Sequence, residues 1–112
     1  MKAKFQIYKS TERNYYFFRL IDESAEIILR SEAYTTISAC KNGVEAVKIN
    51  SIYRSKYDSK MATNGKHYFN LKASNGQVIG TSKLYLSMTV RDKRIDLVQR
   101  IAESADLEDL SD

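Results

Sequence analysis

The sequence predicts an α+β fold in which tandem β-β-β-α(-β) repeats form one antiparallel sheet with two helices on one face. Three observations support this prediction. Residues 67–82 have the pattern of a β-hairpin, residues 16–31 resemble them, and apolar residues at helical spacing follow each stretch. The same order of elements occurring twice in a chain of 112 residues indicates a duplicated supersecondary unit.

The hairpin signal is centred on Asn75-Gly76. We expect a two-residue type I′ turn here, because that turn needs φ > 0 at both central positions and Asn followed by Gly adopts it at the lowest cost. The strand before the turn alternates between two faces, which carry His67, Phe69, Leu71 and Ala73 on one side and Tyr68, Asn70 and Lys72 on the other.

The repeat becomes visible when the chain is aligned with itself at a shift of 51 residues. Identical residues then coincide in both the hairpin and the helical regions: Phe18/Phe69, Leu20/Leu71, Ile28/Ile79, Ser31/Ser82, Tyr34/Tyr85 and Val47/Val98. Two such units would form one sheet. The residues expected to face the helices include Phe18, Leu20, Phe69 and Leu71.

The first unit is predicted to contain strands at residues 4–10, 15–21 and 26–31. The spacing of apolar residues then changes to that of a helix, so residues 35–50 are predicted to form a helix with one apolar face. Thr35 or Thr36 is expected to be its N-cap. Gly43 is intrinsically costly inside a helix and therefore indicates close packing of this helix against the sheet.

The second unit repeats this order, with a strand at residues 56–63, a second type I′ turn signal at Asn64-Gly65, the central hairpin and a helix over residues 87–102. Residues 89–92 resemble a capping box at the start of that helix. Arg94 stands where the first helix has Gly43, so we expect the second helix to lie further from the sheet or to have a wetter edge.

The chain is predicted to be a single domain, 1–112, in which two repeats, about 4–53 and 56–102, share one core. Each half alone is too short to bury a sufficient core, so neither half should be stable by itself. The segment 103–112 contains five acidic residues and no basic one, and we expect it to be a disordered tail.

Composition excludes several classes of protein. No apolar run approaches the length of a membrane span, and the first residues lack the apolar region of a secretory signal. The single cysteine, Cys40, cannot form an internal disulfide, which fits a cytoplasmic location. The net charge is +4, but residues 1–102 hold 18 basic and nine acidic residues, so the body of the protein is strongly basic.

The run from Thr63 to Ser82 contains T-N-G-K and Y-F-N-L-K-A-x-N-G-Q-V-I-G-T-S, and Tyr-x-Ser follows before the second helix. This pattern resembles the YegP-like family of small bacterial proteins of uncharacterised function, which have one or two copies of a motif of about 50 residues. The resemblance implies β-β-β-α-β units joined through exchanged strands and offers no catalytic residue. This chain departs from the family pattern at Ser24-Ala25, where Asn-Gly is usual, and at Arg94, where Gly is usual.

The residues predict no catalytic site. One histidine and one cysteine without a spacing motif do not make a zinc site, so no metal and no cofactor is expected. Cys40 lies on the apolar helix face, where a thiol behaves as an inert small hydrophobe. For His67, packing within the sheet and a ligand or catalytic role both stay open, with packing favoured.

Surface recognition therefore remains as the expected function. If both helices cover one face of the sheet, the other face carries Phe17, Arg19, Tyr68, Asn70 and Lys72. We expect a noncatalytic interaction module, either a monomer with internal pseudo-twofold symmetry or a homodimer, whose partner the sequence does not identify. The alternative is nucleic-acid binding, because rings that stack on bases and cations that meet phosphates are combined on this face.

Overall fold

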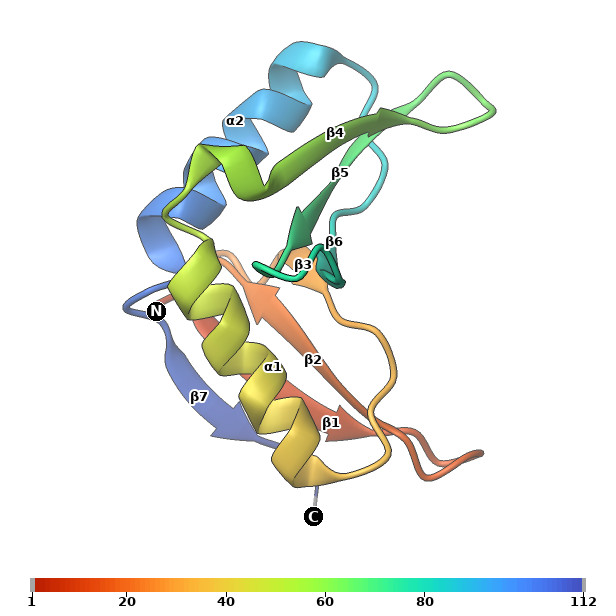
Figure 1. Cartoon of the computed structure of the whole chain (residues 1–112), viewed down its shortest axis with the longest axis vertical. Helices are drawn as coiled ribbons and strands as arrows, with labels where there is room; N and C mark the ends of the chain where they lie inside the picture. The colour runs from red at the N-terminus through yellow and green to blue at the C-terminus, as the bar shows by residue number, and fades with distance from the viewer. Residues whose placement is uncertain (1, 112) are drawn as a thin grey trace.

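The structure is a computed structural model that describes residues 2–111 (Figure 1). Its elements in chain order are β1 (Lys4–Lys9), β2 (Tyr16–Ile21), β3 (Ile27–Arg30), α1 (Ile37–Asn50), the short 3-10 helix η1 (Arg54–Lys56), β4 (Tyr57–Met61), β5 (His67–Lys72), β6 (Val78–Thr81), α2 (Met88–Ile101) and β7 (Asp106–Asp109). The described elements confirm the predicted α+β class and the repeated order of strands and helix.

All seven strands form one sheet in the order β4-β5-β6-β3-β2-β1-β7. The neighbours are antiparallel except β1 and β7, which run parallel. The two units meet at the centre, where Arg30 of β3 pairs with Thr81 of β6. Because this central pair is antiparallel and the order of strands is mirrored on each side of it, an approximate twofold axis relates the units.

The duplication extends to individual hydrogen bonds. Ser31 Oγ accepts from the backbone N–H of Phe18 at 2.8 Å and donates to the Glu32 carbonyl at 2.8 Å. In the second unit, Ser82 Oγ accepts from the Phe69 N–H at 3.0 Å and donates to a backbone carbonyl in the same way. The same local structure therefore surrounds both serines.

One hydrophobic cluster contains residues from both units and from both helices. Its fully buried members include Phe5, Phe18, Leu20, Leu29, Val44, Phe69, Leu71, Ile95 and Val98. At the centre, the Leu29 side chain fills the space over Gly80, so each unit contributes to the surface that the other one buries.

The close approach predicted at Gly43 is confirmed. A Cβ atom at this position would clash with the hydroxyl of Tyr34 and would lie 2.9 Å from Cε2 of Phe18. In the second unit, Arg94 instead forms ion pairs with Glu26 at 3.2 Å and Asp22 at 3.9 Å, across the boundary between the units. The edge of α2 at Arg94 is therefore charged and polar, where the equivalent edge of α1 packs closely on the sheet.

The type I′ turns expected at Asn64-Gly65 and Asn75-Gly76 are wrong. Gly65 has a φ of +83°, but Asn64 is not among the residues with positive φ. Gly76 has a φ of +84°, but Asn75 is not among the residues with positive φ. The loop is three residues long, with Gly76 N–H donating to the Ala73 carbonyl and Gln77 closing the hairpin. This is a type I turn followed by one left-handed residue, and only that residue needs to be glycine.

The helix caps agree with the sequence in one case and differ in the other. Thr36 caps α1 by accepting from the Ala39 N–H at 3.0 Å, as predicted. The capping box expected at residues 89–92 is wrong, because Ser87 caps α2 by accepting from the Val90 N–H at 3.1 Å.

The acidic tail is also more ordered than expected. Residues 106–109 form β7, which pairs parallel to β1 with Lys4 opposite Asp106 and Ile7 opposite Asp109. The outer backbone groups of β1 supply the hydrogen-bond partners that this acidic segment needs to become a strand. Asp112, the last residue of the expected tail, lies outside the described residues.

Candidate binding surface on the open face of the sheet

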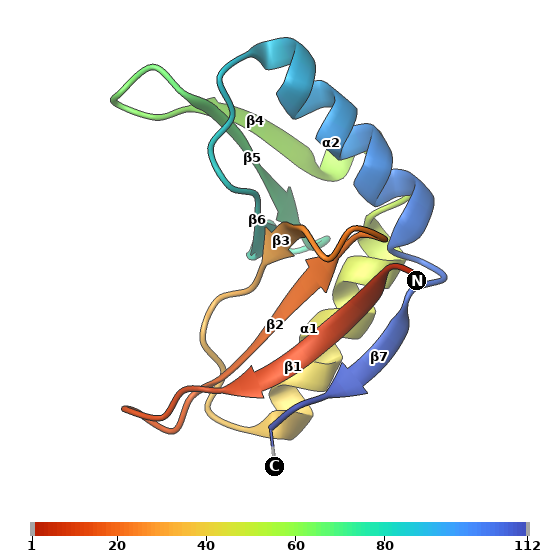
Figure 2. The same cartoon turned by 180° about the vertical axis from the view of Figure 1, so that it is seen from behind.

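A row of polar side chains crosses the sheet from one edge to the other on the face away from the helices. Pairing of neighbouring strands aligns Glu108, Gln6, Arg19, Arg30, Thr81, Asn70 and Asp58. Their sequence neighbours, among them Phe18, Leu20, Phe69 and Leu71, are buried under the helices. Since successive side chains of a strand point to opposite faces, the row lies on the open face, seen with β1 and β2 in front of α1 in Figure 2.

The end of the row at β1 and β7 is a connected network. Arg19 Nε donates to Gln6 Oε1 at 2.9 Å, and Gln6 Nε2 donates to Glu108 Oε1 at 2.7 Å. Lys4 Nζ lies 3.3 Å from the other carboxylate oxygen of Glu108. Hydrogen bonds from Gln6 and Lys4 lower the pKa of Glu108, so this network holds a charged carboxylate near neutral pH.

Aromatic rings fix Arg19 from a second side. Its guanidinium lies 4.7 Å from the ring centroid of Tyr8, and the Tyr8 ring stacks on Phe17 with 5.6 Å between centroids. A cation over an aromatic face is attracted by the ring quadrupole. Arg19 is therefore held in position on the open face by a hydrogen bond and a ring.

The other end of the row, at β4 and β5, carries its own ion pairs. Lys72 and Lys60 lie 3.2 Å and 3.4 Å from Asp58 Oδ2, and their hydrogen bonds lower the pKa of Asp58. Thr81 Oγ1 donates to Asn70 Oδ1 at 2.8 Å. The lysine predicted for this face is thus engaged with a carboxylate of the neighbouring strand.

The centre of the row is different, because two arginines are neighbours there without a carboxylate between them. Arg19 of β2 pairs directly with Arg30 of β3. Arg30 is exposed, and no ion pair involving it occurs among residues 2–111. Guanidinium groups recognise carboxylates and phosphates through paired hydrogen bonds, so this position suits an anionic group of a partner.

The structure places the five predicted surface residues in two separate groups. Phe17 and Arg19 lie on β2, whereas Tyr68, Asn70 and Lys72 lie on β5, with β3 and β6 between them. Sequence reasoning missed Arg30, which joins the two groups. It also missed the partners Gln6 and Tyr8 as part of the surface, although the alternation of the first strand places both on this face.

Cys40 and His67, the two side chains considered for nucleophilic or acid-base chemistry, lie on different elements of the structure. Cys40 is fully buried, and burial raises the pKa of its thiol to about 11. His67 pairs with Tyr85 through the backbone, and its Nδ1 atom is buried without a hydrogen-bond partner. In residues 2–111, no group of three or more His, Cys, Asp or Glu side chains is placed to hold a metal ion.

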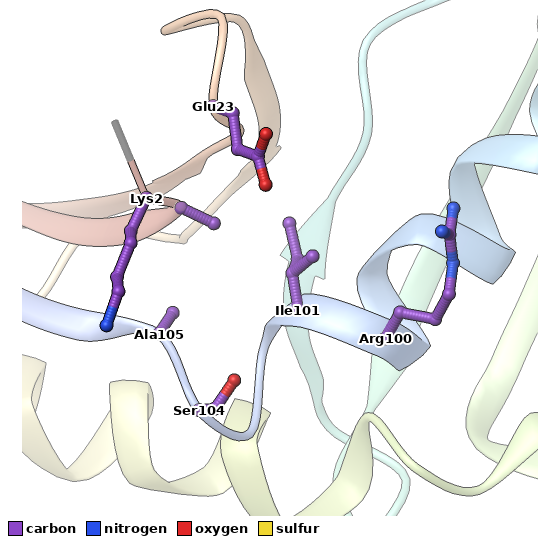
Figure 3. A pocket seen from close by; sticks show the side chains of 7 residues that line it. Lys2, Glu23, Arg100, Ile101, Ser104 and Ala105 are labelled. Carbon is purple, nitrogen blue, oxygen red and sulfur yellow. The ribbon is translucent and has the colours of Figure 1, made fainter.

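A hollow of about 220 Å³ lies where the end of α2 approaches the first unit (Figure 3). Its lining includes Lys2, Glu23, Arg100 and Ser104. In Figure 3 the labelled side chains come from separate segments around an open space and do not converge on one point.

The described helices include none with the length and apolar character required to span a membrane.

A family model described as a domain of unknown function, DUF1508, matches residues 12–58 and 62–109. The second match covers β5, β6, α2 and β7, whereas the first covers β2, β3, α1 and η1 and ends within β4. Among curated proteins, the chain is 39% identical over 111 residues to a UPF0339 protein of Shewanella oneidensis, covering 99% of this chain and 100% of that one. It is 38% identical over 109 residues to the UPF0339 protein YegP of Escherichia coli strain K12, covering 97% and 98%.

Two solution NMR structures are similar to this fold. The UPF0339 protein of Shewanella oneidensis has a TM-score of 0.92 at 39% identity, over 99% of this chain and 93% of that one. The protein YegP of Escherichia coli, titled a protein of unknown function, has a TM-score of 0.92 at 37% identity, over 99% and 95%. These similarities extend across both units of the chain.

Proposed function

Because this chain belongs to the DUF1508 family, whose description names no activity, we propose from its geometry that it is a noncatalytic binding module that presents the open face of its sheet to a partner. The observation that carries the proposal is the pairing of Arg19 with Arg30 at the centre of that face. Like charges directly opposite each other on a sheet are unfavourable, so a partner anion placed between them would relieve a repulsion as well as form hydrogen bonds.

The two arginines differ in a way that suits recognition. Arg19 is held by Gln6 and Tyr8, which lowers the entropy that it would lose on binding. Arg30 is exposed and has its donors free for a ligand within the described part of the chain. A preorganised cation beside an adaptable one favours a partner that presents a carboxylate or phosphate.

A single-stranded nucleic acid is the second candidate partner. Phe17 and Tyr8 lie beside Arg19, and Tyr68 lies on β5 at the other side of the central strands. Aromatic side chains on an open sheet can stack on bases while cations contact phosphates. Because the Tyr8 ring is stacked on Phe17 and also lies under the guanidinium of Arg19, Phe17 and Tyr68 are the better candidates for this role.

The proposal is tested by titrating the protein with two labelled anions, an unstructured single-stranded oligonucleotide and an acidic peptide, at low and at moderate salt. We expect binding that weakens as salt rises, because counterions are released from the partner. The double variant Arg19→Gln with Arg30→Gln should lose at least about tenfold in affinity, since two charge-assisted contacts are removed.

The matched control is Lys93→Gln with Arg100→Gln, which removes the same charge from exposed positions of α2. If net charge alone determined affinity, the two double variants would bind equally weakly. That result would contradict a site on the open face. Binding of the peptide without the oligonucleotide would remove the nucleic-acid candidate. A catalysed turnover that a single substitution abolishes would contradict the noncatalytic assignment.

We also propose a cytoplasmic location, which the buried free thiol of Cys40 supports.

A further inference from the structure

The two outer edges of the sheet are equivalent by the internal symmetry but are covered differently. The edge of β1 is covered by β7, whereas β4 is the last strand on the other side, and among the described residues no strand pairs with its outer edge. Figure 1 shows β4 and β7 at opposite ends of the molecule. Ser59, Lys60 and Met61 on β4 are exposed, and Met61 retains 66% of its accessible surface.

The hydrogen bonds show which backbone groups point away from the molecule at this edge. Ala62 N–H donates to the Lys66 carbonyl across the β4–β5 hairpin. Because direction alternates along an antiparallel strand, Asp58 and Lys60 use their backbone groups toward β5, and Ser59 and Met61 direct theirs outward. On β1 the position equivalent to Ser59 is Ile7, and its outward carbonyl accepts from the Leu110 N–H at 2.7 Å.

The covered edge shows why β4 would not take a second acidic strand of the β7 type. On β1, Lys4 and Gln6 both contact Glu108 of β7. Pairing of β1 with β2 and of β4 with β5 makes Asp58 the equivalent of Gln6. An acidic strand on β4 would therefore bring its carboxylate against the carboxylate of Asp58, a repulsion that the neighbouring Lys60 and Lys72 reduce.

The same residues make β4 complementary to itself. Its sequence is Tyr57-Asp58-Ser59-Lys60-Met61. An antiparallel pair of two β4 strands centred on Ser59 would set Asp58 of each copy opposite Lys60 of the other. The outward groups of Ser59 would meet their own counterparts, and Met61 would lie opposite Tyr57. Asp58 and Lys60 would then form the closely spaced, non-hydrogen-bonded pair, in which opposite charges interact most strongly.

We propose that β4 is a docking edge for a second copy of this chain, in an isologous dimer whose twofold axis passes through the two Ser59 residues. The two sheets would join into one, and the exposed Met61 of each copy would be covered. The proposal does not depend on what the open face binds. Charge complementarity selects the occupant, because each charged residue of the edge finds its opposite on an identical strand.

The first test measures mass by light scattering and sedimentation over a range of protein concentrations. The unmodified chain should show a concentration-dependent dimer. Asp58→Lys would place lysine opposite Lys60 at both ends of the pair, and Lys60→Asp would place aspartate opposite Asp58. Each variant alone should weaken the dimer about tenfold or more, since two attractive pairs become repulsive.

The decisive step is to mix the two variants. Lysines at both positions of one chain then face aspartates at both positions of the other, so a heterodimer should form at concentrations at which each variant alone dimerises weakly. The double variant Asp58→Lys with Lys60→Asp should restore the homodimer. Lys93→Asp on α2 has the same charge change as Lys60→Asp and should leave the dimer unaffected.

Circular dichroism and a thermal melt establish that each variant is folded. If Asp58→Lys disturbs β4 through the loss of its pairing with Lys72, Ser59→Pro supplies an independent variant, because it removes only an outward N–H. This variant should be a folded monomer. A monomeric unmodified chain at every concentration, a dimer unaffected by Ser59→Pro, or a mixture that gives no heterodimer would each overturn the proposal.

Discussion

Ser82 accepts, through its Oγ atom, a hydrogen bond of 3.0 Å from the backbone N–H of Phe69. The residues one repeat earlier, Ser31 and Phe18, make the same bond at 2.8 Å. In each unit the serine thus satisfies a strand N–H beneath a fully buried phenylalanine. This shared role explains why serine and phenylalanine are identical in both repeats although many surface positions between them differ.

Replacing Ser82 by alanine should lower the free energy of unfolding by about 1–3 kcal/mol, because the buried N–H of Phe69 would lose its acceptor. The Ser31→Ala variant should cost less, since Ser31 is more exposed than Ser82 and water can replace its hydroxyl. Urea denaturation of both variants measures the difference. Equal costs at the two positions would contradict the assigned importance of burial.

Gly43→Ala should destabilise the protein by about 1–3 kcal/mol even though alanine favours helices, because the added methyl group overpacks the contact with Tyr34 and Phe18. Tyr34→Phe removes the clashing hydroxyl and should recover part of the loss when combined with Gly43→Ala. Asn42→Ala, at the exposed neighbouring position, is the control. A double-mutant cycle by chemical denaturation checks the coupling, and additive effects would disagree with direct contact.

Ala25→Gly should stabilise the first hairpin. Ala25 has a φ of +63° in the position that Gly76 occupies in the second unit. Relief of the left-handed strain is worth about 1–2 kcal/mol, and the added freedom of glycine in the unfolded chain removes about 0.5–1 kcal/mol of this. Thermal unfolding should therefore show a gain of up to about 1.5 kcal/mol. Gly76→Ala is the reverse control, and a gain there would contradict the argument.

Stability should fall as the pH rises above about 9. Burial raises the pKa of the Cys40 thiol to about 11 and raises the pKa of the Tyr34, Tyr57 and Tyr85 hydroxyls. The unfolded chain releases these protons at their ordinary values, so it binds fewer protons than the folded state between the two pKa values. The contribution of these four groups to the free energy of unfolding should be constant below this window and decrease within it.

Urea denaturation at neutral and alkaline pH measures this slope. Tyr57→Phe removes one of the four groups, together with its 2.8 Å hydrogen bond to the Ser51 carbonyl, so it should lower stability at neutral pH but make the alkaline decline shallower. An alkaline decline that is equally steep in the variant would show that Tyr57 ionisation does not contribute.

The two halves should not fold independently. Leu29 of the first unit packs over Gly80 of the second, and one hydrophobic cluster includes both units. Separate chains covering residues 1–53 and 54–112 should each lack a cooperative thermal transition by circular dichroism. Mixing them should restore one, because the seam between β3 and β6 supplies the missing core. A cooperative transition in either half alone would contradict a shared core.

Much of the open face could be predicted where strands alternate regularly. The regular alternation of β2 up to Leu20 places Phe17 and Arg19 on one face of the strand, and the same rule places Tyr68 and Asn70 on one face of β5. The sequence pattern did not place Arg30 on this face, because the register shifts between Leu20 and Ile21 and two successive residues of β3 are both buried. A bulge interrupts the two-residue alternation of a strand, so alternation no longer predicts which face the following residues occupy.

The order of elements, the duplicated unit and the apolar faces of both helices follow from the sequence, because periodicity and self-similarity are local properties of the chain. The type of the hairpin turns, the pairing of β7 with β1 and the ion pairs of Arg94 with the first unit were decided by the tertiary structure. Each of these depends on which segments meet in space. The acidic residues 106–109 have no strand signal of their own. They form a strand because the edge of β1, with Lys4 and Gln6, lies beside them.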